Sequence, residues 1–135
     1  MAIFANLTQY LSLASDDFSD HIVSCTLQEM YDELDKTNFG SSGNREYVAG
    51  LHDADVTIDF LDDYAASQVW AFWNTNKGTA VAFEWRPTSS SVSSTNPKAT
   101  GNLLVSKMPR GGKVGDLATV SVTWKVTGAV TWATS

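Results

Sequence analysis

The sequence has little of what holds small proteins together covalently or places them in a membrane. Cys25 is the only cysteine among 135 residues, so a disulfide within the chain and zinc sites built on several cysteines are both excluded. No run reaches the roughly 18 apolar residues of a membrane-spanning helix. The start, Met1 to Asn6, lacks the basic region of a signal peptide. We therefore expect a soluble domain made inside a cell.

Positive charge is also scarce. The chain has nine Lys and Arg residues against 15 Asp and Glu residues, for a net charge of −6. Proteins that read nucleic acid sequences normally carry the opposite sign, so this class is not expected. Residues 1–63 hold 13 acidic and two basic side chains, whereas residues 64–135 hold two acidic and seven basic ones. Either the halves pair as neighbouring strands and the charges mix, or one acidic and one basic face favour head-to-tail association.

Motifs of catalysis and metal binding are missing. The two histidines each adjoin an aspartate, in Asp20-His21 and His52-Asp53, but neighbouring residues of a strand point to opposite faces and form no chelate. Cys25 lies in an apolar pattern, which predicts a small buried side chain rather than a nucleophile. The basic stretch 110–113 lacks the P-loop pattern, and the acidic clusters lack the EF-hand pattern. We expect no enzyme, no cofactor and no metal site.

The apolar pattern predicts an antiparallel β-sandwich or barrel of about seven strands with one flanking α-helix. Strands are expected over residues 7–13, 21–34, 46–49, 53–61, 79–86, 101–108 and 117–126, with a last short strand within 129–133. In the fourth of these, four apolar residues alternate with three acids and a threonine. This alternation predicts a half-buried strand with an acidic outer face.

The helix is expected at about residues 63–75. Asp62 and Asp63 would stand at its N-terminus, where the helix dipole favours negative charge, and Gly78 would follow its end. We expect one domain over 1–135, with an N-terminal arm at 1–6 and exposed loops at 36–50 and 87–100. The first loop is rich in Gly and Ser yet contains Phe39, and an exposed aromatic in such a loop usually docks onto a partner.

Several segments, in their order along the chain, resemble a known family. They are Asp-Phe-Ser-Asp-His at 17–21, Ala-Gly-Leu-His-Asp-Ala-Asp-Val-Thr-Ile-Asp-Phe at 49–60, Tyr-Ala-Ala-Ser at 64–67, Phe-Glu-Trp-Arg-Pro-Thr-Ser at 83–89, Ser-Thr-Asn-Pro-Lys at 94–98 and Gly-Asp-Leu-Ala-Thr-Val-Ser-Val-Thr-Trp at 115–124. Over nearly its whole length, the chain resembles the major tail tube proteins of long-tailed bacteriophages with non-contractile tails.

The resemblance implies a structural virion protein. Such subunits form hexameric rings, which stack into a tube whose channel conducts DNA during ejection without binding it specifically. The implied partners are further copies of the chain and other tail proteins, namely the tape measure, terminator and baseplate proteins, with no membrane. The implied location is the virion tail, assembled in the bacterial host cytoplasm.

Two sets of residues are the candidate sites. For the assembly interface we select the apolar arm residues and the ends of the Gly/Ser loop, namely Ile3, Phe4, Lys36, Phe39, Arg45 and Glu46. For the lumen or acidic face we select Asp53, Asp55 and Asp59, because like charge keeps the DNA backbone from sticking to the channel wall.

Two other functions stay open from the sequence. A tail terminator or head–tail connector would form one ring that does not polymerise. A carbohydrate- or protein-binding β-sandwich would instead use exposed tryptophans, for which the candidates are Trp70, Trp73, Trp85, Trp124 and Trp132.

Overall fold

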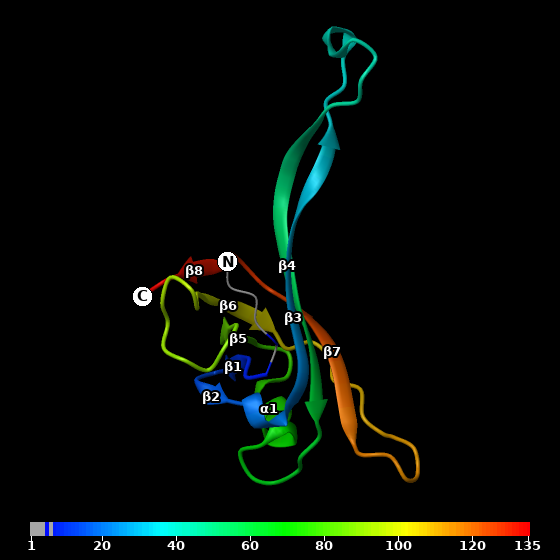
Figure 1. The fold of residues 1–135 in the computed structure, drawn as a ribbon. Coiled ribbons are helices and arrows are strands. Elements are labelled where there is room, and N and C mark those ends of the chain that lie inside the picture. The colour runs from blue at the N-terminus through cyan, green and yellow to red at the C-terminus, as the bar shows by residue number, and fades with distance from the viewer. Residues whose placement is uncertain (1–4, 6) are drawn as a thin grey trace.

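The computed structural model describes residue 5 and residues 7–135 and shows two antiparallel sheets (Figure 1). The five-stranded sheet has the order β2-β1-β5-β6-β8 and consists of β1 (Tyr10–Leu13), β2 (Asp16–Asp17), β5 (Ala80–Arg86), β6 (Lys98–Leu104) and β8 (Thr131–Ala133). The three-stranded sheet has the order β3-β4-β7 and consists of β3 (Ile22–Asp35), β4 (Tyr47–Leu61) and β7 (Thr119–Lys125). One α-helix, α1 (Val69–Asn76), and two 3₁₀ turns, η1 (Ser19–His21) and η2 (Phe39–Ser41), complete the described elements. The expected mainly-β sandwich with one helix is confirmed.

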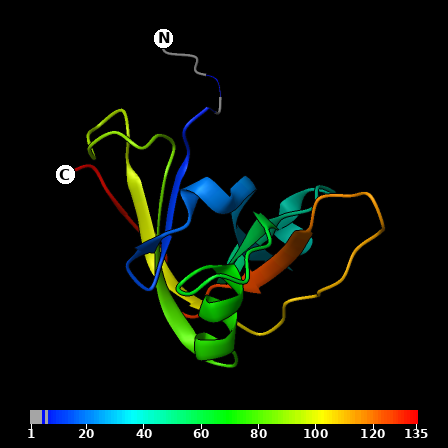
Figure 2. The same ribbon diagram turned by 90° about the horizontal axis from the view of Figure 1, so that it is seen from below.

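The core lies between the two sheets and is closed at one end by α1 (Figures 1 and 2). Alternate residues of each strand enter it, as period-2 patterning requires. Trp124 of β7 is fully buried at its centre, with ring centroids 6.1 Å from Phe60 and 6.2 Å from Phe72. Its indole N–H donates to the carbonyl of Lys107 at 2.7 Å, so the one polar atom of this side chain is satisfied.

The longest feature is the hairpin of β3 and β4, whose register runs from Ile22 opposite Phe60 to Asp35 opposite Tyr47. At about 3.3 Å per residue, the 14 residues of β3 span about 45 Å. Only the half nearest the other strands packs on the core. We call residues 31–52 the hairpin arm, which projects beyond the body of the molecule (Figure 1). Ser41 is the only buried residue in it.

Two predicted strands, 46–49 and 53–61, are one strand. The break predicted between them is absent, because β4 continues through Gly50 to Leu61. Opposite Gly50 the register shifts between Tyr31 and Glu33, which marks a β-bulge. A Cβ on Gly50 would stand 3.0 Å from the Cβ of Asp32, so glycine serves a close approach here and does not terminate the strand.

The helix begins at Val69, not near residue 63, because the two acids expected at its N-terminus have tertiary partners. The guanidinium of Arg110 donates to both carboxylate oxygens of Asp62, at 2.7 and 2.6 Å. Asp63 accepts from the backbone N–H of Ala65 and contacts the ring of His21. These contacts hold residues 62–65 out of helical geometry. Gly78 follows the helix with a φ of +77°, as expected of a residue that ends one.

Other boundaries also move. The first strand begins at Tyr10 instead of residue 7, and the loop expected over 87–100 ends before Lys98, where β6 begins. The strand expected over 101–108 is β6, which runs from 98 to 104, and the loop expected over 36–50 ends before Tyr47. In residues 5 and 7–135, no helix has the length and apolar character needed to cross a membrane.

Candidate assembly surfaces

The tip of the hairpin arm, residues 36–46, is a closed turn fixed by its own polar groups. Asn38 caps η2 by accepting from the N–H of Gly40 at 2.9 Å, and its own N–H donates to the hydroxyl of Ser41 at 3.1 Å. The Ser41 hydroxyl donates in turn to the carboxylate of Glu46 at 2.5 Å. Ser42 and Gly43 take the left-handed φ values of +53° and +81° that reverse the chain. The tip is therefore a defined turn.

Phe39 stands on this turn with its side chain fully exposed to solvent. Burying a phenylalanine side chain is worth about 1.5–3 kcal/mol, and that gain is not realised within the chain. An ordered turn that holds a large apolar side chain in water is typical of a docking contact. The expectation that Phe39 is exposed is met, and its docking role stays a prediction.

Four of the six predicted interface residues lie together at this tip. The backbone N–H of Lys36 donates to the carbonyl of Glu46 at 2.9 Å, which closes the turn. Arg45 contacts Asp35 at 3.3 Å, and Glu46 is held by Ser41. Arg45 and Glu46 thus already have partners inside the tip. Ile3 and Phe4 lie outside the described residues.

The strands of the arm carry further exposed apolar side chains that sequence reasoning missed. They are Tyr31, Leu34, Tyr47, Val48 and Leu51. A single hairpin extending into solvent with apolar groups on it is marginal by itself and usually has a partner. In the structure, the burial of alternate residues in β3 stops at residue 31 although the strand continues to Asp35.

The outer face of the three-stranded sheet carries mostly short polar side chains of one kind. Across the strands, Thr26 stands opposite Thr57 and Thr57 opposite Thr123, and the hydroxyls of the last two contact at 3.0 Å. The same face carries Ser24 and Gln28 of β3 and Ser121 of β7. The face opposite the core therefore consists mainly of short hydroxyl side chains and a few charges, with Gln28 opposite Asp55 and Met30 opposite Asp53.

The three lumen candidates all lie on this outer face of β4. Lys125 of β7 contacts Asp53 at 2.9 Å and Asp55 at 3.8 Å. This hydrogen bond to Lys125 is the main cause that lowers the pKa of Asp53. Asp59 accepts from the hydroxyl of Ser121 at 2.5 Å. Three carboxylates and one ammonium leave the face acidic, and whether it lines a channel stays a prediction.

The β6–β7 loop, residues 105–118, is a second exposed segment, and sequence reasoning treated its Arg110–Lys113 part only as a basic turn. Arg110 fixes its base through the paired contact with Asp62, whose side chain is 4% exposed, and its guanidinium lies 5.1 Å from the ring centroid of Tyr64. Residues 111–118 are exposed. Pairs such as Arg110 with Asp62 and Lys125 with Asp53 show that charges of the two sequence halves do mix.

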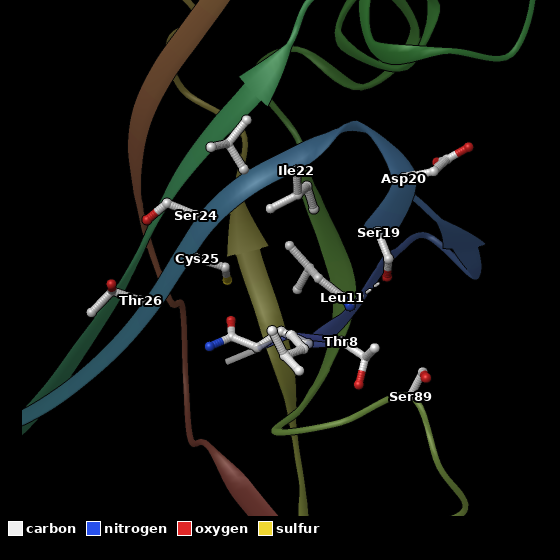
Figure 3. Close-up of a pocket in the computed structure, with 12 residues that line it drawn as sticks. Thr8, Leu11, Ser19, Asp20, Ile22, Ser24, Cys25, Thr26 and Ser89 are labelled. Carbon is white, nitrogen blue, oxygen red and sulfur yellow. Dashed lines mark hydrogen bonds between the residues drawn. The ribbon is translucent and has the colours of Figure 1, made fainter. Parts of the chain in front are cut away.

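A groove of about 550 Å³ runs along the first half of β3 (Figure 3). It is lined by residues 22–26 of β3, by residues 7–9 and Leu11, and by Ser19, whose hydroxyl accepts from the N–H of Leu11 at 3.1 Å. β3 is an edge strand of its sheet, and five consecutive residues of it line the groove, so the groove follows its free edge. An edge with free backbone groups can accept another strand.

The side chains capable of chemistry are engaged in structural contacts. The ring of His21 bridges Asp20 and Asp63, at 2.8 Å each, and these two hydrogen bonds, that of Asp63 first, raise its pKa. Cys25 is buried as expected, which raises the pKa of its thiol to about 12. Among the residues that the structure describes, no three or more His, Cys, Asp or Glu side chains are grouped to hold a metal ion.

Of the five tryptophans, Trp85 and Trp132 meet edge to face, with ring centroids 6.1 Å apart. Trp124 is buried, Trp73 and Trp85 are half-buried, and the two exposed ones, Trp70 and Trp132, lie on α1 and β8, on different sides of the body (Figure 1). The indole N–H of Trp132 donates to Glu29 of β3 at 3.0 Å. The alternative of a binding module thus has only the pair of Trp85 and Trp132 to rest on, since the exposed Trp70 lies apart from it on α1.

Comparison with known proteins gives matches of fold. The sequence matches no protein-family model and no curated protein. A chain in the virion of a native gene transfer agent (GTA) particle superposes with a TM-score of 0.65 at 13% identity, over 84% of this chain and 85% of that one. A chain in the tail of an empty GTA particle with C6 symmetry gives 0.71 at 16% identity, over 95% and 96%. The chain thus has the fold of a GTA tail structure, consistent with its sequence resemblance to phage tail tube proteins.

Proposed function

We propose that this chain is the tube subunit of a phage-type tail, a structural and non-enzymatic virion protein. The observation that carries the proposal is the fold match over 95% of this chain and 96% of a chain in a GTA tail of C6 symmetry. A match at both lengths means that little of either chain falls outside the common fold. Six copies in a ring are the corresponding assembly, with the virion tail as its place and the host cytoplasm as the site of assembly.

The two sheet edges support ring formation. In the three-stranded sheet, β3 and β7 are the outer strands, and such edges are a hazard for a protein that stays monomeric. If β7 of one copy adds to the free edge of β3 in the next, the sheets join into a continuous barrel around a central channel. The groove along residues 22–26 leaves that edge accessible. This contact is heterologous, and a heterologous contact that closes gives a ring.

The outer face of the joined sheets would then line the channel. Its hydroxyl side chains offer weak, uniform contacts, and Asp53, Asp55 and Asp59 outnumber Lys125. A wall of this kind repels the DNA backbone and carries no cluster of cations to hold it. DNA passes along such a channel without specific binding.

The hairpin arm supports stacking of one ring on the next. It extends from one end of the body, and Phe39 on its tip is fully exposed (Figure 1). Contact with the neighbouring ring would bury Phe39 and part of the apolar side chains on the arm. The tape measure, terminator and baseplate proteins are the further partners of such a tube.

Negative-stain electron microscopy of the purified chain over a range of concentrations tests the proposal. Hollow tubes or stacked rings with a central channel are the expected result. Single rings that never stack would contradict the tube role and indicate a tail terminator or a head–tail connector. A chain that stays monomeric at every concentration, also when added to tail tips assembled from the other tail proteins, would overturn the proposal.

A further inference from the structure

We propose that the β6–β7 loop is the acceptor that receives the hairpin tip of a second copy of this chain. The inference rests on the proposed tube function and names the surface on which one ring meets the next. It names a partner for Phe39 on the tip and for the acidic side chains of Asp32 and Glu33 nearer the base of the arm.

The two segments lie at opposite ends of the molecule. The hairpin arm leaves one end of the body, and the β6–β7 loop leaves the other end, beyond β7 (Figure 1). A tip and a loop of the same copy therefore cannot meet. Two copies stacked head to tail do bring the tip of one to the loop end of the other, without any change of fold.

Their charges are complementary. On the arm, Asp32 and Glu33 are exposed, and neither has an ion-pair partner in the described chain, whereas the neighbouring Asp35 contacts Arg45. In the loop, Lys107 and Lys113 are exposed and likewise make no ion pair with a described residue. Opposite charges facing each other fix orientation and speed up association, and like charges prevent the reverse orientation.

Their apolar side chains match as well. Phe39 is fully exposed at the tip, and Val114 and Leu117 are 100% and 74% exposed in the loop. Each segment thus combines large apolar groups in water with an excess of unpaired charge, which is negative on the arm despite Lys36 and positive in the loop despite Asp116. A contact between them would bury all three apolar side chains, the arrangement of an apolar centre with a charged rim that interfaces show.

The loop is held firmly enough at its base to act as a fixed acceptor. Arg110 joins it to Asp62 with two hydrogen bonds, and the carbonyl of Lys107 accepts from the indole of Trp124 in the core. Within the loop, the N–H of Asp116 donates to the carbonyl of Lys113 at 3.1 Å, which turns the chain between the two exposed apolar residues. The hairpin tip and the β6–β7 loop are thus both turns whose ends are held in place by hydrogen bonds.

Charge reversal tests the pairing. D32K/E33K on the arm and K107E/K113E in the loop should each raise the protein concentration needed for tubes about tenfold or more, since exposed pairs contribute up to about 1 kcal/mol each. The variant with all four changes should assemble near the wild-type concentration, because the charges are exchanged. K77E/K98E changes the net charge by the same amount at positions outside the loop. As the control, it should form tubes near the wild-type concentration. Normal assembly of both double variants would overturn the inference, and so would impaired double variants whose fourfold combination does not recover.

Cross-linking gives a second, independent readout. Asn44→Cys, which keeps Phe39 on the tip, and Gly112→Cys, where a Cβ meets open space in the loop, are mixed, assembled, treated with a short bismaleimide and quenched before denaturation; the native Cys25 is buried. We expect covalent dimers from the mixture and few from either variant alone. Tubes without mixed dimers would overturn the acceptor assignment and leave the tube function standing. Absence of rings and tubes from the wild type would instead overturn the proposed function, and the acceptor with it.

Discussion

At the scale of single residues, polar side chains far apart in the sequence decide where the segments between strands lie. His21 is the clearest case, because its ring joins Asp20 beside it to Asp63, 42 residues further along. The same Asp63 accepts from the N–H of Ala65, so the contact fixes the path of the chain from β4 to α1. One imidazole thereby ties η1 to the segment that precedes the helix.

This contact makes stability depend on pH. The pKa of His21 is raised in the folded chain, mainly by its hydrogen bond to Asp63, so the folded state holds the proton more tightly than the unfolded state. The contribution of the charged ring is present in full below the ordinary pKa of about 6.5 and is lost as the pH rises through the higher folded value. His21→Gln should therefore destabilise the chain at about pH 5.5 and much less at about pH 8.5.

Urea unfolding of wild type and His21→Gln across this pH range measures the effect. The difference in unfolding free energy should shrink steadily as the pH rises. Asp63→Asn, which removes the main partner, should flatten the pH dependence in the same way. A difference that is constant with pH would contradict the role given to the charged ring.

At the scale of elements, the sequence predicts the strand segments that pack on the core. It does not predict the segments that have solvent on both faces. The alternation from Asp53 to Leu61 identifies the buried face of β4 correctly, because Ala54, Val56, Ile58 and Phe60 all meet the other sheet. The outer half of the same hairpin leaves no such pattern, since both of its faces meet solvent. Its length, and the continuity of β4 through Gly50, therefore had to come from the structure.

The start of the helix was predicted wrongly for a second reason. Asp62 and Asp63 read locally as a helix start, and that local preference is worth less than 1 kcal/mol. Arg110 and His21, 48 and 42 residues away, bind these acids instead. Contacts over such separations are set by the sheet topology and are not visible in a local pattern. For the same reason the sequence does not show that the hairpin tip and the β6–β7 loop lie at opposite ends of the molecule, whereas the exposure of Phe39 was predicted from its loop.

The bulge at Gly50 leads to a prediction about the arm alone. Gly50→Ala would place a Cβ 3.0 Å from the Cβ of Asp32 and 3.2 Å from the side chain of Leu34. Because the core begins beyond this point, the strain should loosen the arm and leave the body intact. Hydrogen exchange should become faster at residues 31–35 and 47–51 and stay unchanged in β7. Faster exchange in β7 as well would show that the arm and the body unfold together.

The hairpin tip leads to another. Phe39→Ser removes a side chain that touches nothing else in the fold, so the free energy of unfolding should change by less than about 0.5 kcal/mol. Tube formation should nevertheless be lost or need a much higher concentration, as electron microscopy and sedimentation would show. Ser42→Asn is the matched control, because asparagine tolerates the left-handed φ of +53° at that position. Normal tubes from Phe39→Ser would remove Phe39 from the interface.

At the scale of the whole molecule, the acidic outer face of the three-stranded sheet is the surface that would line the channel of the proposed tube. Asp59→Lys reverses one charge on that face, and a ring of six would repeat it six times. Tubes of this variant should retain short duplex DNA at low salt in a co-sedimentation assay, whereas wild-type tubes should not. Asp16→Lys, on the exposed strand β2, is the control. Equal retention by both variants would show that this face does not line the channel.

The projection of the arm from one end only gives any polymer of this chain a direction. In a tube built as proposed, one terminus displays the hairpin tips and the other displays the bare β6–β7 loops, so the two termini are chemically different surfaces. An initiating complex needs only one of these surfaces, and a protein that halts growth must imitate the other. The two termini should therefore add subunits at different rates, because each offers a different surface to the incoming copy.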